Sequence, residues 1–249
     1  MSKPYESLTE LHRDLDHVIL TAHRGASADC PENTLPAFER AVEAGADLIE
    51  FDLRASADGV PLVLHDSTLD RTTDGKGEPE LLPLAEIRTL NVVNTAGVKI
   101  PTFEEVLAAF STRTMMNIQI YAKTEAILAE ICRLYRAYSM YDRGYLSIAS
   151  RAQLDFVRRV DPEIEICFLP GWETRATPES LRLCRKLGCR FVQPVKESVT
   201  AETIPCCREL GLRENLFFCD DPDEAVRLAQ GGVRGLLTNR IPALVPVRY

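Results

Sequence analysis

Two histidines, two carboxylates and an arginine stand where apolar segments of the chain end. His23 and Arg24 directly follow one apolar run. Glu50 and Asp52 alternate along a second run, and His65 follows a third. Imidazole suits proton transfer near neutral pH, two hard oxygen donors on one face suit Mg²⁺ or Ca²⁺, and a guanidinium matches phosphate bidentately. These residue types indicate acid–base chemistry on an anionic group.

The elements that must position these side chains alternate between strand and helix. Apolar segments are separated by amphipathic segments in units of roughly 25 to 30 residues, which predicts parallel strands joined by crossover helices. We expect an α/β fold, a single (β/α)8 TIM-type barrel domain over residues 1–249, with an open doubly wound sheet as the second choice. The expected strands are 18–21, 47–53, 116–121, 145–149, 165–169, 190–195, 215–219 and 235–238. The expected helices are 33–44, one beginning at Pro101-Thr102, 125–138, 152–160, 178–187, 201–210 and 223–230.

A ninth apolar segment, 61–64, lies too close to the second strand to be its parallel neighbour. A parallel crossover needs about a dozen residues, whereas Asp52 and Pro61 are separated by a short stretch that includes Asp58-Gly59, a two-residue hairpin signal. We therefore expect a hairpin in which paired residue numbers sum to 117, so that Asp52 faces His65. Barrel active sites form at the carboxyl ends of the strands, so the histidines, carboxylates and arginine should share one mouth.

Composition excludes several classes of protein. The chain has 249 residues, of which 45% are hydrophobic and 27% charged, which excludes a disordered chain, a collagen-like chain and a small disulfide scaffold. A net charge of −8 without a basic run argues against nucleic acid as a partner. No apolar run approaches the roughly 18 residues of a membrane span, and the charged start does not resemble a signal peptide. We expect a cytoplasmic protein without stable membrane insertion. The helix faces do not decide between monomer and dimer.

The cysteines do not form a recognisable ligand set. There are eight in the chain, with no Cys-x-x-Cys pair, and Cys206 and Cys207 are adjacent. This spacing suits neither zinc ligation nor a regular disulfide framework. We expect reduced thiols buried as small hydrophobic side chains.

Short motifs follow one another in a fixed order along the first half of the chain. They are His23-Arg24-Gly25, Pro31-Glu32-Asn33-Thr34, Ala37-Phe38, Gly45-Ala46-Asp47, Ile49-Glu50-Phe51-Asp52, Asp58-Gly59, His65-Asp66, Leu69-Asp70-Arg71-Thr72-Thr73-Asp74-Gly75 and Ile100-Pro101-Thr102-Phe103-Glu104-Glu105-Val106. Together they closely resemble the glycerophosphodiester phosphodiesterase family, and the resemblance continues more thinly to Ala243. It implies a (β/α)8 barrel that hydrolyses a small glycerophosphodiester, such as glycerophosphocholine or glycerophosphoethanolamine, to glycerol phosphate and an alcohol.

The resemblance also implies roles for individual residues. His23 and His65 would be the catalytic general base and general acid, and the sequence does not assign which is which. Arg24 would bind a phosphate oxygen of the substrate. In the family the attacking group is the substrate's own glycerol hydroxyl, through a cyclic phosphate.

The metal site implied by the resemblance departs from the family pattern. Glu50 and Asp52 resemble the family's metal pair, and Glu32 fits either as a ligand or orienting group or as a residue that begins a helix. Gln119 stands where the family's Asn-x-Glu-x-Lys motif has a further acidic ligand, and would be a neutral third partner. One Mg²⁺ or Ca²⁺, with Mn²⁺ as an alternative, would then be neutral with its two carboxylates (2 − 2 = 0). We expect weaker metal retention in the free protein than three carboxylates would give.

Further departures concern the substrate. Tyr121 stands where the motif has Lys, and Lys123 either supplies the missing amine from about 6 to 7 Å further along the strand or is an exposed residue at a helix start. Phe217 keeps an aromatic substrate-binding wall for the glycerol end. Asn239 is interpreted as structural, and Trp172 as a residue of a loop over the pocket.

Two other functions stay open. The first is a catalytically weakened or inactive family member that binds phosphodiesters without cleaving them, since Gln119 and Tyr121 replace charged residues. Retention of both histidines argues against it, because a pure binder needs no acid–base pair. The second is an enzyme that acts on a different diester, such as a lysophospholipid, although no basic amphipathic stretch for membrane contact is present.

Overall fold

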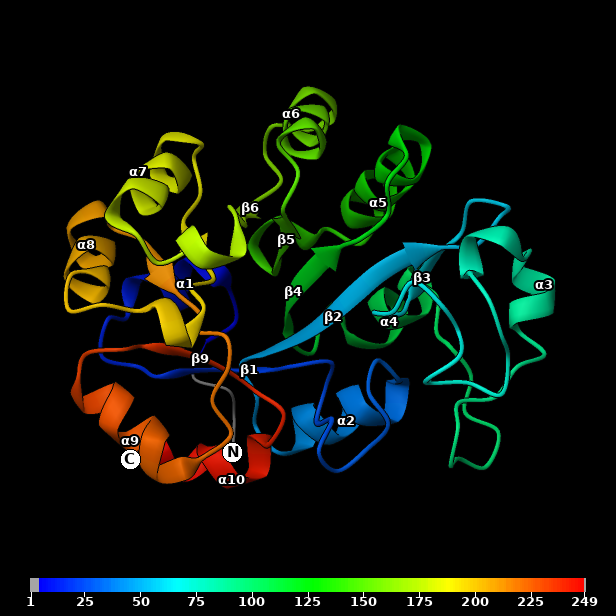
Figure 1. Ribbon diagram of the computed structural model, residues 1–249, viewed down its shortest axis with the longest axis horizontal. Helices are drawn as coiled ribbons and strands as arrows, with labels where there is room; N and C mark the ends of the chain where they lie inside the picture. The colour runs from blue at the N-terminus through cyan, green and yellow to red at the C-terminus, as the bar shows by residue number, and fades with distance from the viewer. Residues whose placement is uncertain (1–4, 249) are drawn as a thin grey trace.

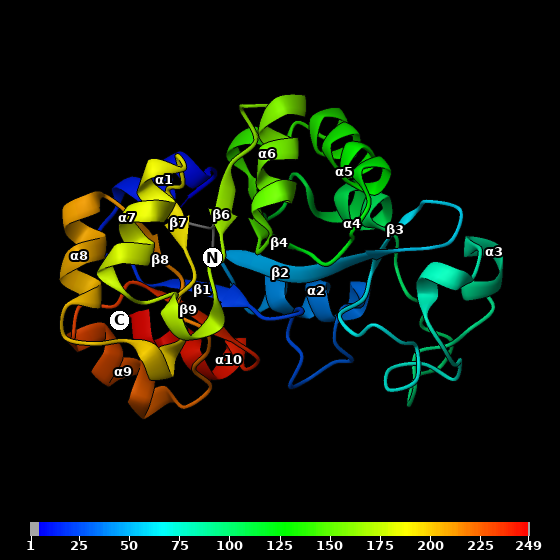
Figure 2. The same cartoon turned by 45° about the horizontal axis from the view of Figure 1, so that its top comes forward.

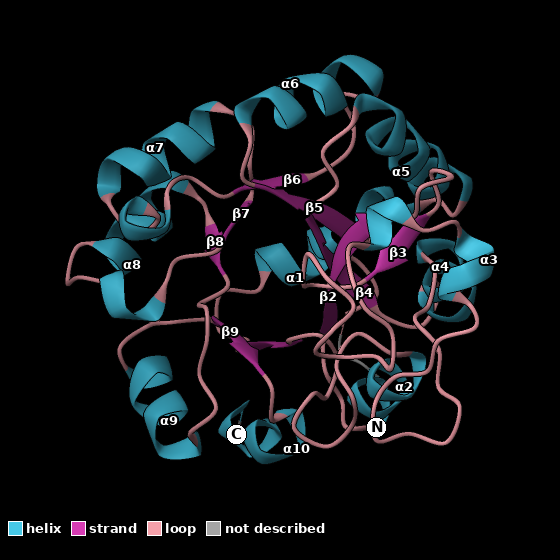
Figure 3. Cartoon of the chain, turned by 45° about the vertical axis from the view of Figure 1, so that its right-hand side comes forward, coloured by secondary structure: helices cyan, strands magenta, loops and turns pink. Residues whose placement is uncertain are grey.

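The computed structural model describes residues 5–248, without the side chains of Glu173 and Arg248. Parallel strands surround a central axis and helices form an outer layer (Figure 3). The strands are β1 Ile19–Ala22, β2 Leu48–Ala55, β3 Pro61–Val63, β4 Met115–Ile120, β5 Gly144–Ile148, β6 Ile166–Phe168, β7 Phe191–Val192, β8 Arg213–Glu214 and β9 Gly235–Thr238. The α-helices are α1 Leu8–Arg13, α2 Leu35–Glu43, α3 Leu84–Ile87, α4 Phe103–Phe110, α5 Glu125–Ala137, α6 Arg151–Val160, α7 Pro178–Lys186, α8 Thr203–Leu210, α9 Pro222–Gln230 and α10 Ile241–Leu244.

The main sheet curls around the axis in the order β6-β5-β4-β2-β1-β9, and these strands are parallel. β7 and β8 form a second parallel pair. A bridge from Leu216 to Leu236 joins the segment after β8 to β9. Among the described residues no ladder joins β6 to β7. The expected α/β fold with a curled parallel sheet is therefore confirmed, whereas hydrogen bonding does not complete the ring.

The hairpin forms, but its predicted register was wrong by one residue. β3 pairs antiparallel with β2, and the partners Leu53↔Val63 and Ala55↔Pro61 have numbers that sum to 116 instead of 117. The cause is the turn: Ser56 N–H donates to the carbonyl of Val60, so three residues rather than two connect the arms. Gly59 at φ +85° supplies the left-handed residue that such a loop needs. Asp52 consequently pairs with Leu64, and His65 lies just beyond the paired region.

The strand expected at 215–219 was also displaced. β8 comprises Arg213 and Glu214, whose side chains are buried although both are charged. Because both residues are charged, the apolar pattern of the sequence did not indicate where this strand begins. The expected helix start at Thr102 is confirmed, since Thr102 and Glu105 form a capping box.

The short helix α1 closes the amino-terminal end of the strand ring, and the sequence did not predict it. Its buried Leu8 and Leu11 pack in one cluster with inward side chains of the strands, including Ile19, Leu48 and Tyr145. Figure 3 shows α1 in the middle of the ring of strands. The hydrophobic floor supports the polar side chains above it.

The segment that follows His65 projects from one side of the molecule (Figures 1 and 2). It carries α3 and has its own small core, in which Leu64, Leu69, Ile87 and Ile100 are buried. The loop therefore folds as a packed unit beside the hairpin.

The cysteines match the expectation of buried thiols. All eight are free and seven are buried, with Cys30 half-buried. Burial raises the pKa of the Cys132 thiol to about 11, so it stays protonated near neutral pH. Within residues 5–248, no helix has the length and apolar character that crossing a bilayer requires.

Candidate active site

A cavity of about 220 Å³ lies at the carboxyl ends of the strands. It gathers eight of the residues that sequence analysis named, from segments distant in the chain, and two others, Arg175 and Gln193. Its lining residues are His23, Arg24, Asp52, His65, Gln119, Tyr121, Trp172, Arg175, Gln193 and Phe217. Glu50 is buried two residues before Asp52 on the same strand.

His23 is held by an amide. Its Nδ1 lies 2.8 Å from Asn239 Oδ1, and Asn239 Nδ2 donates to Asp220 at 2.7 Å. Because a carboxylate only accepts hydrogen bonds, the amide nitrogen of Asn239 must face Asp220 and its oxygen must face His23. Nδ1 therefore carries the proton, and Nε2 is an acceptor. Burial, followed by the charge of Arg24, lowers the pKa of His23 and favours the neutral ring.

His65 is held by a carboxylate instead. Its Nδ1 lies 2.8 Å from Asp66 Oδ1, and Arg71 Nε donates to the other Asp66 oxygen at 2.6 Å. Hydrogen bonds from Arg71, and further ones from His65, lower the pKa of Asp66. A carboxylate only accepts hydrogen bonds, so Nδ1 of His65 carries a proton in this contact.

A strained turn fixes Arg24 beside the carboxylates. Arg24 has φ +56°, which is uncommon for a residue with a side chain. This conformation lets its backbone N–H donate to Glu50 Oε2 at 2.9 Å. Its guanidinium contacts Asp52 at 3.4 Å and Glu32 at 2.9 Å. The charge of Arg24 is therefore shared between two acidic side chains.

Glu32 lies at the rim of the site and pairs with arginines. Arg24 and Arg71 both donate to it, Arg71 through two hydrogen bonds of 2.8 and 2.7 Å. Burial raises the pKa of Glu32, but these arginines outweigh it and leave the pKa lowered. These contacts match the orienting role that sequence analysis gave as one alternative.

Gln119 and Tyr121 form a hydrogen-bonded pair. Gln119 Nε2 donates to the Tyr121 hydroxyl at 2.5 Å, and that hydroxyl lies 3.3 Å from His65 Nε2. With its nitrogen held by Tyr121, the amide of Gln119 keeps its oxygen for another partner. Gln119 is the register neighbour of Asp52 across β2 and β4, so the two side chains share a face.

Comparison with known proteins identifies the family. The model of the glycerophosphoryl diester phosphodiesterase family matches residues 23–243. The chain belongs to this family. A glycerophosphodiester phosphodiesterase of Caldanaerobacter subterraneus is 28% identical over 236 residues, 91% of this chain and 96% of the relative. Family membership confirms the resemblance found in the sequence and the expected enzyme class.

Solved structures of the family have the same architecture. The glycerophosphodiester phosphodiesterase of Agrobacterium tumefaciens, 26% identical, superposes with a TM-score of 0.80 over 91% of this chain and 98% of that one. A phosphodiesterase of Oleispira antarctica in complex with sn-glycerol-3-phosphate has a TM-score of 0.84 at 22% identity, covering 92% and 96%. The fold is thus a family property.

Three oxygen donors of the site could hold a divalent cation, namely Glu50, Asp52 and Gln119. Glu50 is a buried carboxylate, and burial with the nearby charge of Asp52 raises its pKa well above the usual range. A carboxylate in this state lacks counter-charge, which a cation would supply. Within the described part of the chain no group of three or more His, Cys, Asp or Glu is arranged to hold a metal. The fit therefore rests on Glu50, Asp52 and the amide oxygen of Gln119.

Sequence reasoning missed several residues of the site. Asn33 Nδ2 donates to Asp52 at 2.9 Å, and Asn239, interpreted as structural, orients His23. Arg175 and Gln193 line the cavity from the segments that follow β6 and β7. Such partners meet only when the ring forms, so the local sequence carried no signal for them. Trp172 does lie on a loop beside the cavity, as expected, with its ring 5.4 Å from Phe217.

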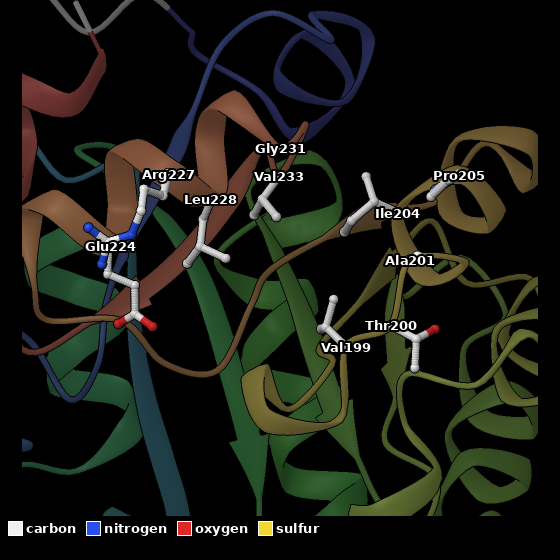
Figure 4. A pocket seen from close by; sticks show the side chains of 10 residues that line it. All are labelled: Val199, Thr200, Ala201, Ile204, Pro205, Glu224, Arg227, Leu228, Gly231 and Val233. Carbon is white, nitrogen blue, oxygen red and sulfur yellow. The ribbon is translucent and has the colours of Figure 1, made fainter.

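Two other cavities lie away from these residues. Lys123, a candidate substrate-binding residue, is exposed and lines a cavity of about 660 Å³ beside the hairpin. It directly precedes Thr124, the N-cap of α5, as in the helix-start alternative. A groove of about 430 Å³ lies between the α8 and α9 regions (Figure 4). Neither cavity is lined by a histidine.

Proposed function

We propose that the protein hydrolyses a small glycerophosphodiester to glycerol phosphate and an alcohol, with His23 as general base and His65 as general acid. The observation that carries this proposal is the different partner of each Nδ1 atom in one cavity. Burial and the charge of Arg24 favour a neutral His23, and the contact with Asn239 leaves its Nε2 as the acceptor, whereas the Nδ1 of His65 faces the carboxylate of Asp66, which can balance a proton on that ring. The two rings are thereby prepared for opposite directions of proton transfer.

The proposed reaction follows the family's route through a cyclic phosphate. His23 Nε2 takes the proton of the glycerol hydroxyl as its oxygen bonds to phosphorus. The bond from phosphorus to the leaving oxygen breaks, and His65 Nε2 gives that oxygen a proton. Water then opens the cyclic ester with the two proton transfers reversed. The products are glycerol phosphate and the alcohol.

The proposal includes one divalent cation, Mg²⁺ or Ca²⁺ with Mn²⁺ as an alternative. Glu50, Asp52 and Gln119 would hold it, and a bound cation stabilises negative charge on phosphate oxygens. Glu32 orients Arg24 and Arg71 at the rim. Phe217, which packs edge-on against His23 at 5.3 Å, forms the apolar wall for the glycerol end.

The relatives support the substrate class. A relative with which this chain shares most of its length is a glycerophosphodiester phosphodiesterase by name, and the Oleispira antarctica structure contains sn-glycerol-3-phosphate. A cavity of about 220 Å³ suits a glycerol phosphate moiety. We further propose that the scaffold is a closed (β/α)8 barrel, with side-chain packing between β6 and β7 completing the ring. The proposed setting is the cytoplasm.

The test is release of glycerol phosphate from glycerophosphocholine with Mg²⁺, Mn²⁺ or Ca²⁺, against EDTA. We expect metal-dependent turnover that His65→Ala lowers by about 10² to 10⁴, the usual contribution of a general acid. Asp155→Asn, on an exposed side chain of α6 far along the chain from the site, is the control. Turnover that survives His65→Ala unchanged would refute the assignment.

The binding-only alternative gives a different result. If the wild type is inactive and Gln119→Glu restores turnover, the exchange at position 119 has removed activity and the protein binds without cleaving. If both are inactive, a panel of other diesters, including lysophospholipids, becomes the next assay.

A further inference from the structure

Arg175 is a cation of the active-site cavity that sequence analysis did not select. It lies between the turn Trp172–Thr174 and α7, and its side chain lines the cavity with both histidines. Its Nε donates to the carbonyl of Pro170 at 3.0 Å, and its guanidinium carbon lies 4.9 Å from the centre of the Trp172 ring. These two contacts fix the guanidinium plane and leave both terminal nitrogens for another partner.

Among the side chains that the structure describes, no carboxylate pairs with Arg175. The titratable groups that act on it are Cys167 and Tyr121, whose raised pKa values keep both neutral near pH 7. Burial lowers the pKa of Arg175, as it does for a cation without a counter-ion. Arg24 differs, because the charges of Asp52 and Glu32 overcome the effect of burial and raise its pKa.

The cavity therefore contains two guanidinium groups with different partners. That of Arg24 is paired with carboxylates, and that of Arg175 has no carboxylate partner among the described side chains. Arg24 already balances two carboxylates, and Tyr121 brings no charge of its own. An uncompensated cation costs free energy when it is buried, unless an anion joins it. A tetrahedral phosphate presents paired oxygens that match the two terminal nitrogens of a guanidinium.

We propose that Arg175 binds the phosphate of the substrate and is the main cationic phosphate contact of this chain. The proposal rests on the proposed function for the identity of the substrate, but not for the binding of phosphate itself. Arg175 contacts the phosphate end-on through its terminal nitrogens, while Trp172 and Pro170 keep it in place.

Trp172 provides a direct measurement of this contact. It is the single tryptophan of the chain and lies against the guanidinium of Arg175. Phosphate that binds to Arg175 should therefore change the fluorescence of Trp172. We would titrate the protein in saturating Mg²⁺ with sn-glycerol 3-phosphate and, separately, with inorganic phosphate. Calorimetry on the same samples measures affinity independently of the fluorophore.

The decisive variant is Arg175→Gln, with Arg182→Gln as its control. Arg182 is an exposed arginine of α7, so its loss changes net charge equally without altering the cavity. We expect Arg175→Gln to weaken phosphate binding tenfold or more and to raise KM more than it lowers kcat, while Arg182→Gln binds as the wild type does. Arg175→Lys should keep part of the affinity.

A second variant distinguishes the loss of charge at Arg175 from misfolding of its loop. If charge is what matters, Tyr121→Lys placed in the Arg175→Gln background should recover phosphate affinity, which a disturbed loop would not allow. A loss below tenfold in Arg175→Gln, an equal loss in Arg182→Gln, or a wild type that binds no phosphate would overturn the proposal. Phosphate binding that depends on Arg175 in a protein that cleaves no diester would uphold it and refute only the proposed function.

Discussion

Asp66 is a charged partner of His65 Nδ1, whereas the partner of His23 Nδ1 is the neutral amide of Asn239. Asp66→Asn keeps the shape of the side chain but removes the negative charge beside Nδ1 of His65. A general acid acts only when protonated, so activity disappears as pH rises past its titration. We expect the basic limb of the kcat/KM profile to lie at lower pH in Asp66→Asn than in the wild type, because the proposed general acid loses its anionic partner.

The acid limb of the same profile reports on the general base. The pKa of His23 is lowered by burial, so this base stays neutral to below pH 6.5, its ordinary value. Asp66→Asn should leave that limb in place. Asp29→Asn, which removes an exposed carboxylate paired with Arg40, is the control for net charge. Equal movement of both limbs would contradict the separate roles of the two histidines.

The hydroxyl of Tyr121 links Gln119, a proposed metal ligand, to His65, the proposed general acid. Tyr121→Phe removes the acceptor that holds Gln119 and the group next to His65 Nε2. Loss of such an outer partner typically lowers metal affinity or activity by about 10- to 100-fold. We expect a fall in kcat of this size, and a higher metal concentration for half-maximal activity. Tyr138→Phe, at the C-terminal end of α5, is the matched control. A Tyr121→Phe enzyme with wild-type metal dependence would exclude the link.

At the residue scale, the sequence predicted the groups that lie at strand ends and not the groups that orient them. Glu50 and Asp52 follow from the two-residue period of a strand. Asn239 and Arg175 come from late segments that approach the site only in the folded ring. Their roles depend on distances across the barrel, which no local pattern carries.

At the scale of elements, α1 places a histidine at the amino-terminal ends of the strands. His12 packs edge-on against Phe191 at 5.7 Å, and its Nδ1 is buried without a hydrogen-bond partner. Burial, followed by the charges of neighbouring arginines, lowers the pKa of His12 to about 4. These arginines are Arg190, Arg213, Arg185 and Arg13.

This histidine makes the fold sensitive to acid. Its pKa falls from about 6.5 in the unfolded chain to about 4 in the folded protein, so between these values the unfolded chain binds the extra proton. Stability is therefore complete above pH 6.5 and decreases as pH falls toward 4. By pH 5 the loss attributable to His12 should be about 2 kcal/mol.

Urea unfolding at pH 7.5 and pH 5 measures this loss. The wild type should lose about 2 kcal/mol more than His12→Gln, whose side chain does not titrate. All other titrating groups are shared by the two proteins, so the difference isolates His12. If the free energy of unfolding falls equally in the two proteins, protonation of His12 does not destabilise the fold. Movement of α1 or entry of water would then accommodate the charge.

Most elements were predictable because their periodicity and caps are local. Thr102 and Glu105 specify the start of α4 without help from the rest of the fold. The hairpin register was not predictable, because Asp58-Gly59 suits both a two-residue turn and the three-residue loop that forms. α1 is only six residues long, and its reason to be helical is the barrel floor that it covers.

At the scale of the whole molecule, the strand ring places a negative centre beneath a rim of arginines. Glu50 is buried and Asp52 is its close neighbour, while the protein as a whole has a net charge of −8. No local motif predicts how these charges balance, since Arg24, Arg71 and Arg175 reach the site from three different loops. The site is therefore sensitive to any further charge at its centre.

Gln119→Glu tests this balance in the absence of substrate. In EDTA, a third carboxylate beside Glu50 and Asp52 adds repulsion within a buried site, which should destabilise the protein by about 1 to 3 kcal/mol. With a divalent cation the same group adds an ionic ligand, so stabilisation by metal, which grows as RT ln(1 + [L]/Kd), should be larger than in the wild type. We expect Gln119→Glu to have a lower melting temperature than the wild type in EDTA. In millimolar Mg²⁺ or Ca²⁺ this difference in melting temperature should become smaller or change sign.

The control is Gln153→Glu, at a side chain of α6 that donates to the carbonyl of Ala122 outside the cavity. Micromolar or tighter metal binding by the wild type without substrate would contradict the weak retention that a neutral third ligand predicts.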